Sequence, residues 1–79
     1  MKTTLKLARV GMSMEVATVV KWHKQPGQTF KAGEPLYEIE TEKVNQEIEA
    51  TSDGIMIEQC AREGDIVKVG GQVCVVDLA

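Results

Sequence analysis

Residue types that usually carry chemistry are scarce in this chain of 79 residues. It has three aromatic residues and a single histidine, His23. A histidine-based metal cluster or a Ser-His-Asp triad therefore lacks parts, and we expect neither a metal site nor an enzyme. The core has to be built mainly from aliphatic side chains.

Excess positive charge and long apolar runs are also missing. Nine Lys and Arg residues against twelve Asp and Glu residues give a net charge of −3, whereas nucleic-acid binding requires a basic patch. No apolar run approaches the roughly 18 residues of a membrane span, and the first residues lack the apolar centre of a signal peptide. We expect no nucleic-acid or membrane partner and a cytoplasmic location, or the mitochondrial matrix in a eukaryote.

Cysteine is limited to Cys60 and Cys74. Their spacing matches neither a zinc-binding pattern nor a Cys-x-x-Cys redox motif. We predict that both are small buried hydrophobic residues in a reducing compartment, and a disulfide between them is the alternative.

What fills the chain instead is a series of strand-like segments separated by turns. No window carries a helical stripe, and turn signals recur at the roughly 8–12-residue spacing of a small all-β sandwich or barrel. We predict one all-β domain over residues 1–79. The expected strands cover residues 2–7, 16–22, 29–31, 36–41, 44–50, 55–60, 66–67 and 73–76.

The second of these strands has an ambiguous phase. Alternate residues from Val16 to Trp22 share one face, and Val19 falls on the other face. Either both faces are covered or a bulge lies near Val19. Met12 and Met14, just before this strand, are predicted to fill the core.

An internal repeat with an offset of 37 residues runs through the chain. Each half contains Gly-x-x-x-Lys-x-Gly, at residues 27–33 and again at 64–70. Such a repeat predicts two similar halves packed about an approximate two-fold axis. Further positions match at this offset: Ala17 with Gly54, Val20 with Ile57, Phe30 with Val67, Leu36 with Val73, Ile39 with Val76, and Glu40 with Asp77.

The repeat singles out Lys43, because 37 residues further on lies one position past the end of the chain. The first half therefore ends in a hairpin that carries a lysine at Glu42-Lys43, opposite the two termini. An exposed turn lysine is commonly only a solubilising residue. On a rigid tip among glutamates, with no catalytic partner, it has the features of a substrate for covalent attachment.

The hairpin resembles that of the lipoyl domains of 2-oxo acid dehydrogenase complexes. Glu-Thr-Glu-Lys-Val at 40–44 is similar to the family signature Glu-Thr-Asp-Lys-Ala/Val, with Glu42 in place of aspartate. The resemblance continues over essentially the whole chain, including residues 11–14, 20–22, 27–33, 47–50 and 54–55. Two departures, Val16-Ala17 for a common Glu-Gly and Thr51 for a common proline, leave the modification site intact.

This resemblance implies a flattened barrel of two four-stranded antiparallel sheets and lipoic acid in amide linkage to Lys43. By the same resemblance, a lipoate ligase or lipoyl transferase is expected to attach the group, and the arm is expected to visit a thiamin-diphosphate decarboxylase component, an acyltransferase catalytic domain and dihydrolipoyl dehydrogenase. The domain is then a carrier, and we expect the isolated domain to be monomeric. Recognition by these enzymes is expected to involve Glu40, Thr41, Glu42, Val44 and Glu47.

Two related assignments stay open. A biotin carrier domain shares the fold, but that family flanks its lysine with methionines, where this chain has Glu42 and Val44. An unmodified lipoyl-like structural module needs no Glu-Thr-x-Lys hairpin. The sequence leaves open whether the complex acts on pyruvate, 2-oxoglutarate, a branched-chain oxo acid or acetoin.

Overall fold

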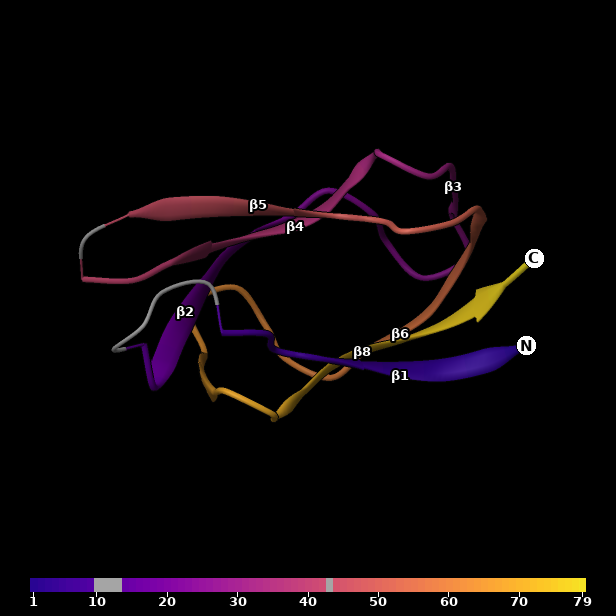
Figure 1. The fold of residues 1–79 in the computed structure, drawn as a ribbon. Helices are drawn as coiled ribbons and strands as arrows, with labels where there is room; N and C mark the ends of the chain where they lie inside the picture. Colours follow the sequence, from indigo (N-terminus) through magenta and orange to yellow (C-terminus); the bar gives the residue numbers. More distant parts are fainter. Residues whose placement is uncertain (10–13, 43) are drawn as a thin grey trace.

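The computed structural model describes residues 1–9, 14–42 and 44–79, which form two face-to-face antiparallel sheets (Figure 1). The strand orders are β1-β8-β6-β3 and β5-β4-β2-β7, which confirms the predicted fold. Within these ranges no helix has the length and apolar character to cross a membrane. The strands are β1 (Lys2–Lys6), β2 (Val16–Trp22), β3 (Thr29–Phe30), β4 (Pro35–Glu40), β5 (Asn45–Glu49), β6 (Gly54–Gln59), β7 (Ile66–Lys68) and β8 (Gln72–Leu78).

The 37-residue repeat is visible in the backbone. It relates β2, β3 and β4 to β6, β7 and β8, and with β5 taking the place of β1 the two sheet orders become identical. Hydrogen bonds that extend the β2–β7 and β6–β3 pairs recur as well. Val19 N donates to Asp65 O at 2.9 Å, and the equivalent Met56 N donates to Gln28 O at 2.9 Å. The chain therefore folds as two equivalent halves.

The repeated glycines explain why the pattern is detectable in the sequence. Gly27, Gly33, Gly64 and Gly70 have φ angles of 92°, 89°, 97° and 86°. Residues with a Cβ rarely adopt this left-handed region. Both halves therefore need glycine at the same turn positions, whatever residues surround them.

A bulge resolves the ambiguous phase of β2. Its register with β4 shifts between Val19 and Lys21, so the side chains change phase there. The buried residues are Ala17, Val19 and Trp22, while Val16 is 46% exposed. Of the two alternatives that the sequence left open, the bulge near Val19 is confirmed, and Val16 and Trp22 therefore do not share one face. The repeat places a second bulge in β6, between Met56 and Glu58.

The core fills the space between the sheets, and the matched apolar positions of the repeat contribute to it from both halves. Met14 is buried as predicted, while Met12 lies outside the described residues. The buried residues are Leu7, Met14, Ala17, Val19, Trp22, Phe30, Leu36, Tyr37, Ile39, Ala50, Met56, Ala61, Val67, Val73, Cys74 and Val76.

Of the two cysteines that were predicted to be buried, only one is buried. Both are free thiols; Cys74 is buried, but Cys60 is exposed, because the bulge in β6 changes the side-chain phase between Met56 and Cys60. Burial raises the pKa of Cys74 to about 12, with a smaller contribution from Cys60. Desolvation, followed by the charge of Glu58, also raises the pKa of Cys60. Neither thiol has the lowered pKa of a reactive cysteine.

Candidate functional site

The β4–β5 hairpin is closed by backbone and side-chain hydrogen bonds across its turn. Glu40 pairs with Asn45, and Thr41 N then donates to Val44 O at 2.8 Å. The Thr41 hydroxyl donates to the same carbonyl at 3.1 Å and accepts from Val44 N at 3.2 Å. Thr41 thus fixes the two ends of the turn, and only positions 42 and 43 remain between them.

Lys43 itself lies outside the described residues, so the structure describes its site through its neighbours. Glu40 and Glu42 are exposed, Val44 is 51% exposed, and Thr41 is partly buried. The turn that contains position 43 therefore has both flanking residues in solvent. Such a turn can present a side chain to another protein, but it encloses no reaction chamber.

This turn and the two termini lie at opposite ends of the body (Figure 1). The longest dimension of the domain is 33 Å, against 20 and 18 Å in the other directions. At the end away from the turn, the Met1 ammonium donates to Asp77 Oδ1 at 2.6 Å and to Leu78 O at 2.7 Å. Chain attached at that end would leave the hairpin tip clear.

Strand β4 holds the hairpin against the core. Tyr37 and Ile39 are almost completely buried, and the Tyr37 ring lies 5.2 Å from that of Trp22 at an interplanar angle of 48°. Burial raises the pKa of Tyr37 to about 12, so its hydroxyl stays protonated near neutral pH. Strand β4 of the hairpin is therefore anchored in the core.

Glu47 is placed away from the other predicted recognition residues. Glu40, Thr41, Glu42 and Val44 gather at the turn, whereas Glu47 lies further along β5, directly opposite Glu38 of β4. A shallow hollow on this face is lined by Glu38, Asn45, Gln46, Glu47 and Glu49.

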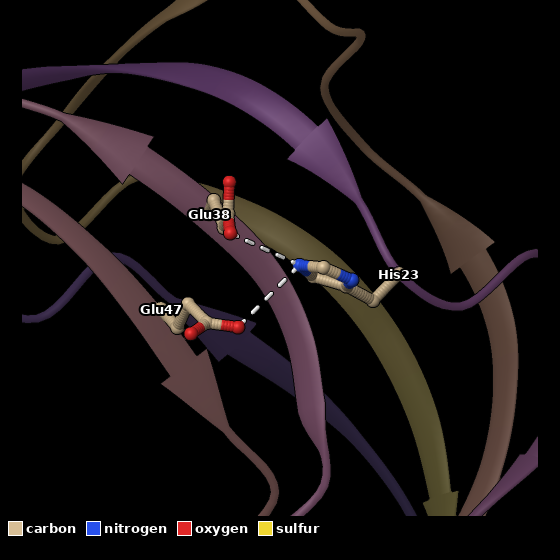
Figure 2. Close-up of side chains that lie close together, drawn as sticks. All are labelled: His23, Glu38 and Glu47. Carbon is tan, nitrogen blue, oxygen red and sulfur yellow. Dashed lines mark ion pairs between the residues drawn. The ribbon is translucent and has the colours of Figure 1, made fainter.

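His23 joins this acidic face, a position that the sequence reasoning missed. Its Nε2 lies 3.4 Å from Glu38 Oε1 and 3.7 Å from Glu47 Oε2 (Figure 2). The three residues come from separate segments, so only the strand register brings them together. Counting residues outward from the Lys43 turn predicts that Glu38 lies opposite Glu47. The same count gives no position for His23, which lies outside this hairpin.

Comparison with known proteins agrees with the geometry. The sequence matches the biotin/lipoyl family model, described as biotin-requiring enzyme, over residues 3–76. It is 38% identical over 72 residues to the dihydrolipoyllysine-residue succinyltransferase component of the 2-oxoglutarate dehydrogenase complex of Staphylococcus saprophyticus. It is 34% identical over 76 residues to the acetyltransferase component of the pyruvate dehydrogenase complex of Corynebacterium glutamicum. The matches cover 91% and 96% of the chain, but only 17% and 11% of these relatives.

Two solved structures share the fold, and one of them is a lipoyl domain. The lipoyl domain of the 2-oxoglutarate dehydrogenase complex from Azotobacter vinelandii has a TM-score of 0.79 and 35% identity, with 94% of each chain covered. A single-chain, multi-domain long-chain acyl-CoA carboxylase has a TM-score of 0.82, but only 19% identity. That match covers 99% of this chain and 7% of the carboxylase, and it shows the fold alone.

The family match and the similarity to a solved lipoyl domain show that this two-fold β sandwich is a carrier domain, a module that holds a covalent group and is not itself catalytic. The chain belongs to the biotin/lipoyl attachment family, and within it to the lipoyl domains, whose covalent group is lipoic acid.

Proposed function

We propose that Lys43 carries lipoic acid in amide linkage and that the domain moves this arm between the active sites of a 2-oxo acid dehydrogenase complex. The observation that supports the site is the turn closed by Thr41 and Val44, at the end of the body away from the termini. When bound, the group supplies a disulfide that takes up an acyl group and electrons.

The residues around position 43 fit this group. An amide-linked arm that must reach several partners needs an accessible turn without an enclosing wall, and Glu42 and Val44 are both exposed. Hydrogen bonds between Thr41 and Val44 fix the residues on either side of positions 42 and 43 relative to each other. A tethered group gains effective concentration at each partner when its base is held in this way.

We further propose that Glu40, Glu42 and Val44 are contacted by the attaching enzyme and by the decarboxylase component. Glu47 lies on the adjoining acidic face, where it extends a negative surface toward a basic partner. The remaining partners are a lipoate ligase or lipoyl transferase, an acyltransferase catalytic domain and dihydrolipoyl dehydrogenase. A reducing compartment such as the cytoplasm suits the free thiols of Cys60 and Cys74.

Attachment is tested by incubating the chain with lipoate ligase, ATP and lipoate, followed by intact-mass measurement and peptide mapping. We expect a single lipoyl increment on the wild type and none on Lys43→Arg. Lys21→Arg is the matched control, because Lys21 is exposed but lies in β2; it should be modified like the wild type. An increment that persists in Lys43→Arg would refute the site.

A biotin ligase reaction run in parallel decides between the two groups that the family carries. Modification with biotin and none with lipoate would replace the lipoyl proposal with the biotin carrier. The oxo acid is then tested by offering the lipoylated domain to decarboxylase components specific for 2-oxoglutarate and for pyruvate. The component that reductively acylates the domain at the higher kcat/KM identifies the complex.

A further inference from the structure

We propose that His23, Glu38 and Glu47 bind one divalent transition-metal ion, of which Zn²⁺ is the representative, on the outer face of the β4–β5 hairpin. This site is separate from the turn that contains position 43, and it does not depend on the attached group. It uses one nitrogen and two carboxylate oxygens from three segments of the chain.

The backbone places these side chains before any ion is present. His23 follows β2, and its N–H donates to Leu36 O in β4 at 2.9 Å. Glu38 lies two residues beyond Leu36, on the same strand. Glu47 is held opposite Glu38 by the β4–β5 register. Two neighbouring strands and the end of a third therefore fix the bases of the three side chains.

The distances fit ligands that share an ion better than they fit a direct hydrogen bond. The separations of 3.4 and 3.7 Å from His23 Nε2 exceed the usual N–H···O range, which ends near ~3.2 Å. Two ligands at about 2.0–2.2 Å from a tetrahedral zinc ion lie roughly 3.3–3.6 Å apart. All three donor atoms lie within 4.8 Å of one another, and Glu47, 56% exposed, has room to adjust.

The imidazole nitrogen is an unusual feature of an open surface. His23 Nε2 is buried and makes no hydrogen bond among the described residues, and it points between the two carboxylates (Figure 2). A buried nitrogen without a hydrogen bond is costly, and a metal ion would satisfy it. This nitrogen sets the cluster apart from an ordinary group of exposed acids.

Charge supports the same occupant. Glu38 and Glu47 face each other across the strand pair, and like charges in directly opposite positions destabilise a sheet. A divalent cation between them offsets this repulsion. One imidazole and two carboxylates suit Zn²⁺ and neighbouring first-row ions, and three protein ligands leave a coordination position for water.

The rival explanation is a protonated His23 that forms ion pairs with both glutamates and needs no metal. The two explanations differ in a direct measurement, the response of the His23 side-chain nitrogens to added Zn²⁺. His23 is the only histidine, so its imidazole signals in ¹⁵N NMR are assigned without ambiguity. The experiment uses the Cys60→Ser chain, because the exposed Cys60 thiol is a competing zinc ligand.

We expect saturable one-to-one binding of Zn²⁺ with a large shift of His23 Nε2, reversed by a chelator. His23→Gln and Glu38→Gln should each weaken binding about tenfold or more. Glu49→Gln is the matched control, because it removes the same charge from the same hollow outside the cluster, and it should change affinity by less than about twofold. Thermal melting in the absence of zinc verifies that each variant is folded.

Three results would overturn the proposal. The first is a His23 Nε2 signal that does not move when Zn²⁺ is saturating. The second is half-saturation only in the millimolar range, and the third is a loss in Glu49→Gln as large as that in Glu38→Gln. The NMR readout uses the native histidine, so it gives a decision even if a variant fails to fold.

Discussion

The two halves of the domain share one backbone design and differ in what occupies equivalent positions. At one end β4 and β5 are joined by the turn fixed by Thr41 and Val44, while at the other end β8 and β1 are paired but not joined. The duplicated strands supply the two sheets, which we call the frame. The function that we propose depends on the turn that has no second copy.

The difference is also seen inside the frame. Trp22 Nε1 donates to Ala61 O at 3.1 Å, and the equivalent Gln59 Nε2 donates to Lys24 O at 3.0 Å. The same backbone position needs a donor in both halves, but only the first half uses a buried aromatic ring for it. The bond is therefore shared, whereas the packing contribution belongs to one half.

The largest expected effect separates these two contributions. Trp22→Ala should lower the free energy of unfolding by about 3–5 kcal/mol, because it empties a large buried volume beside Tyr37. Gln59→Ala removes the equivalent hydrogen bond at a less buried position and should cost about 0.5–1.5 kcal/mol. Urea unfolding followed by circular dichroism measures both. An equal loss of unfolding free energy in the two variants would show that these equivalent positions contribute equally to stability.

A second test uses the matched positions 17 and 54. A Cβ on Gly54 would lie 2.6 Å from Asp77 O and 3.0 Å from the Phe30 ring, so Gly54→Ala forces two backbones apart. Such overpacking costs about 1–3 kcal/mol. The equivalent Ala17 already carries a buried methyl group, and Ala17→Gly should cost only about 1 kcal/mol. A stabilising Gly54→Ala in the same unfolding assay would contradict the close approach seen here.

The turn glycines should respond equally in the two halves. Gly27 and Gly64 have φ angles of 92° and 97°, with nothing within 4 Å of an added Cβ. Gly27→Ala and Gly64→Ala therefore introduce backbone strain without a clash, about 1–2 kcal/mol each. The difference between the two variants, measured by thermal unfolding, should be smaller than either effect. A clear inequality would show that the symmetry is limited to geometry.

The smallest effect is a pH dependence that arises from Glu34 and has no counterpart at the equivalent position of the second half. The Lys31 backbone N–H, and then Lys24, hold the pKa of Glu34 below its ordinary value, and the equivalent residue is Gly71. A lowered folded-state pKa gives stability that is present above the unfolded-state value near 4.5 and is lost as the pH falls through the folded-state value. The melting temperature of the wild type should therefore fall more steeply below about pH 4.5 than that of Glu34→Gln. Parallel curves would exclude this contribution.

Much of the frame could be predicted because it depends on local requirements. The repeated glycines mark turn positions with a positive φ angle, which residues with a Cβ rarely adopt. Both members of matched apolar pairs such as Ile39 and Val76 are buried. The phase of β2 could not be read, because a bulge changes it in the middle of the strand. The exposure of Cys60 follows from the equivalent bulge in β6, which the sequence does not reveal either.

The site was only partly predictable for a similar reason. The turn residues from Glu40 to Val44 are contiguous, so their pattern is visible in the sequence, and their role in attachment stays a prediction. The cluster around His23 depends on which residues of three segments face each other, and this register is not encoded in any one segment. The count of one histidine led us to expect no metal site, because it left out the two carboxylates that are the other donors of the proposed site.

The pairing of residues 1 and 78 has a topological consequence. Because the first and last strands lie side by side, the two ends of the chain meet, and the chain can be treated as a circle that is cut at one place. A short peptide linking the two ends would close the circle, and a new cut could then be made at any other turn. A copy of the segment 41–44 placed in that link would create a domain with two presenting ends.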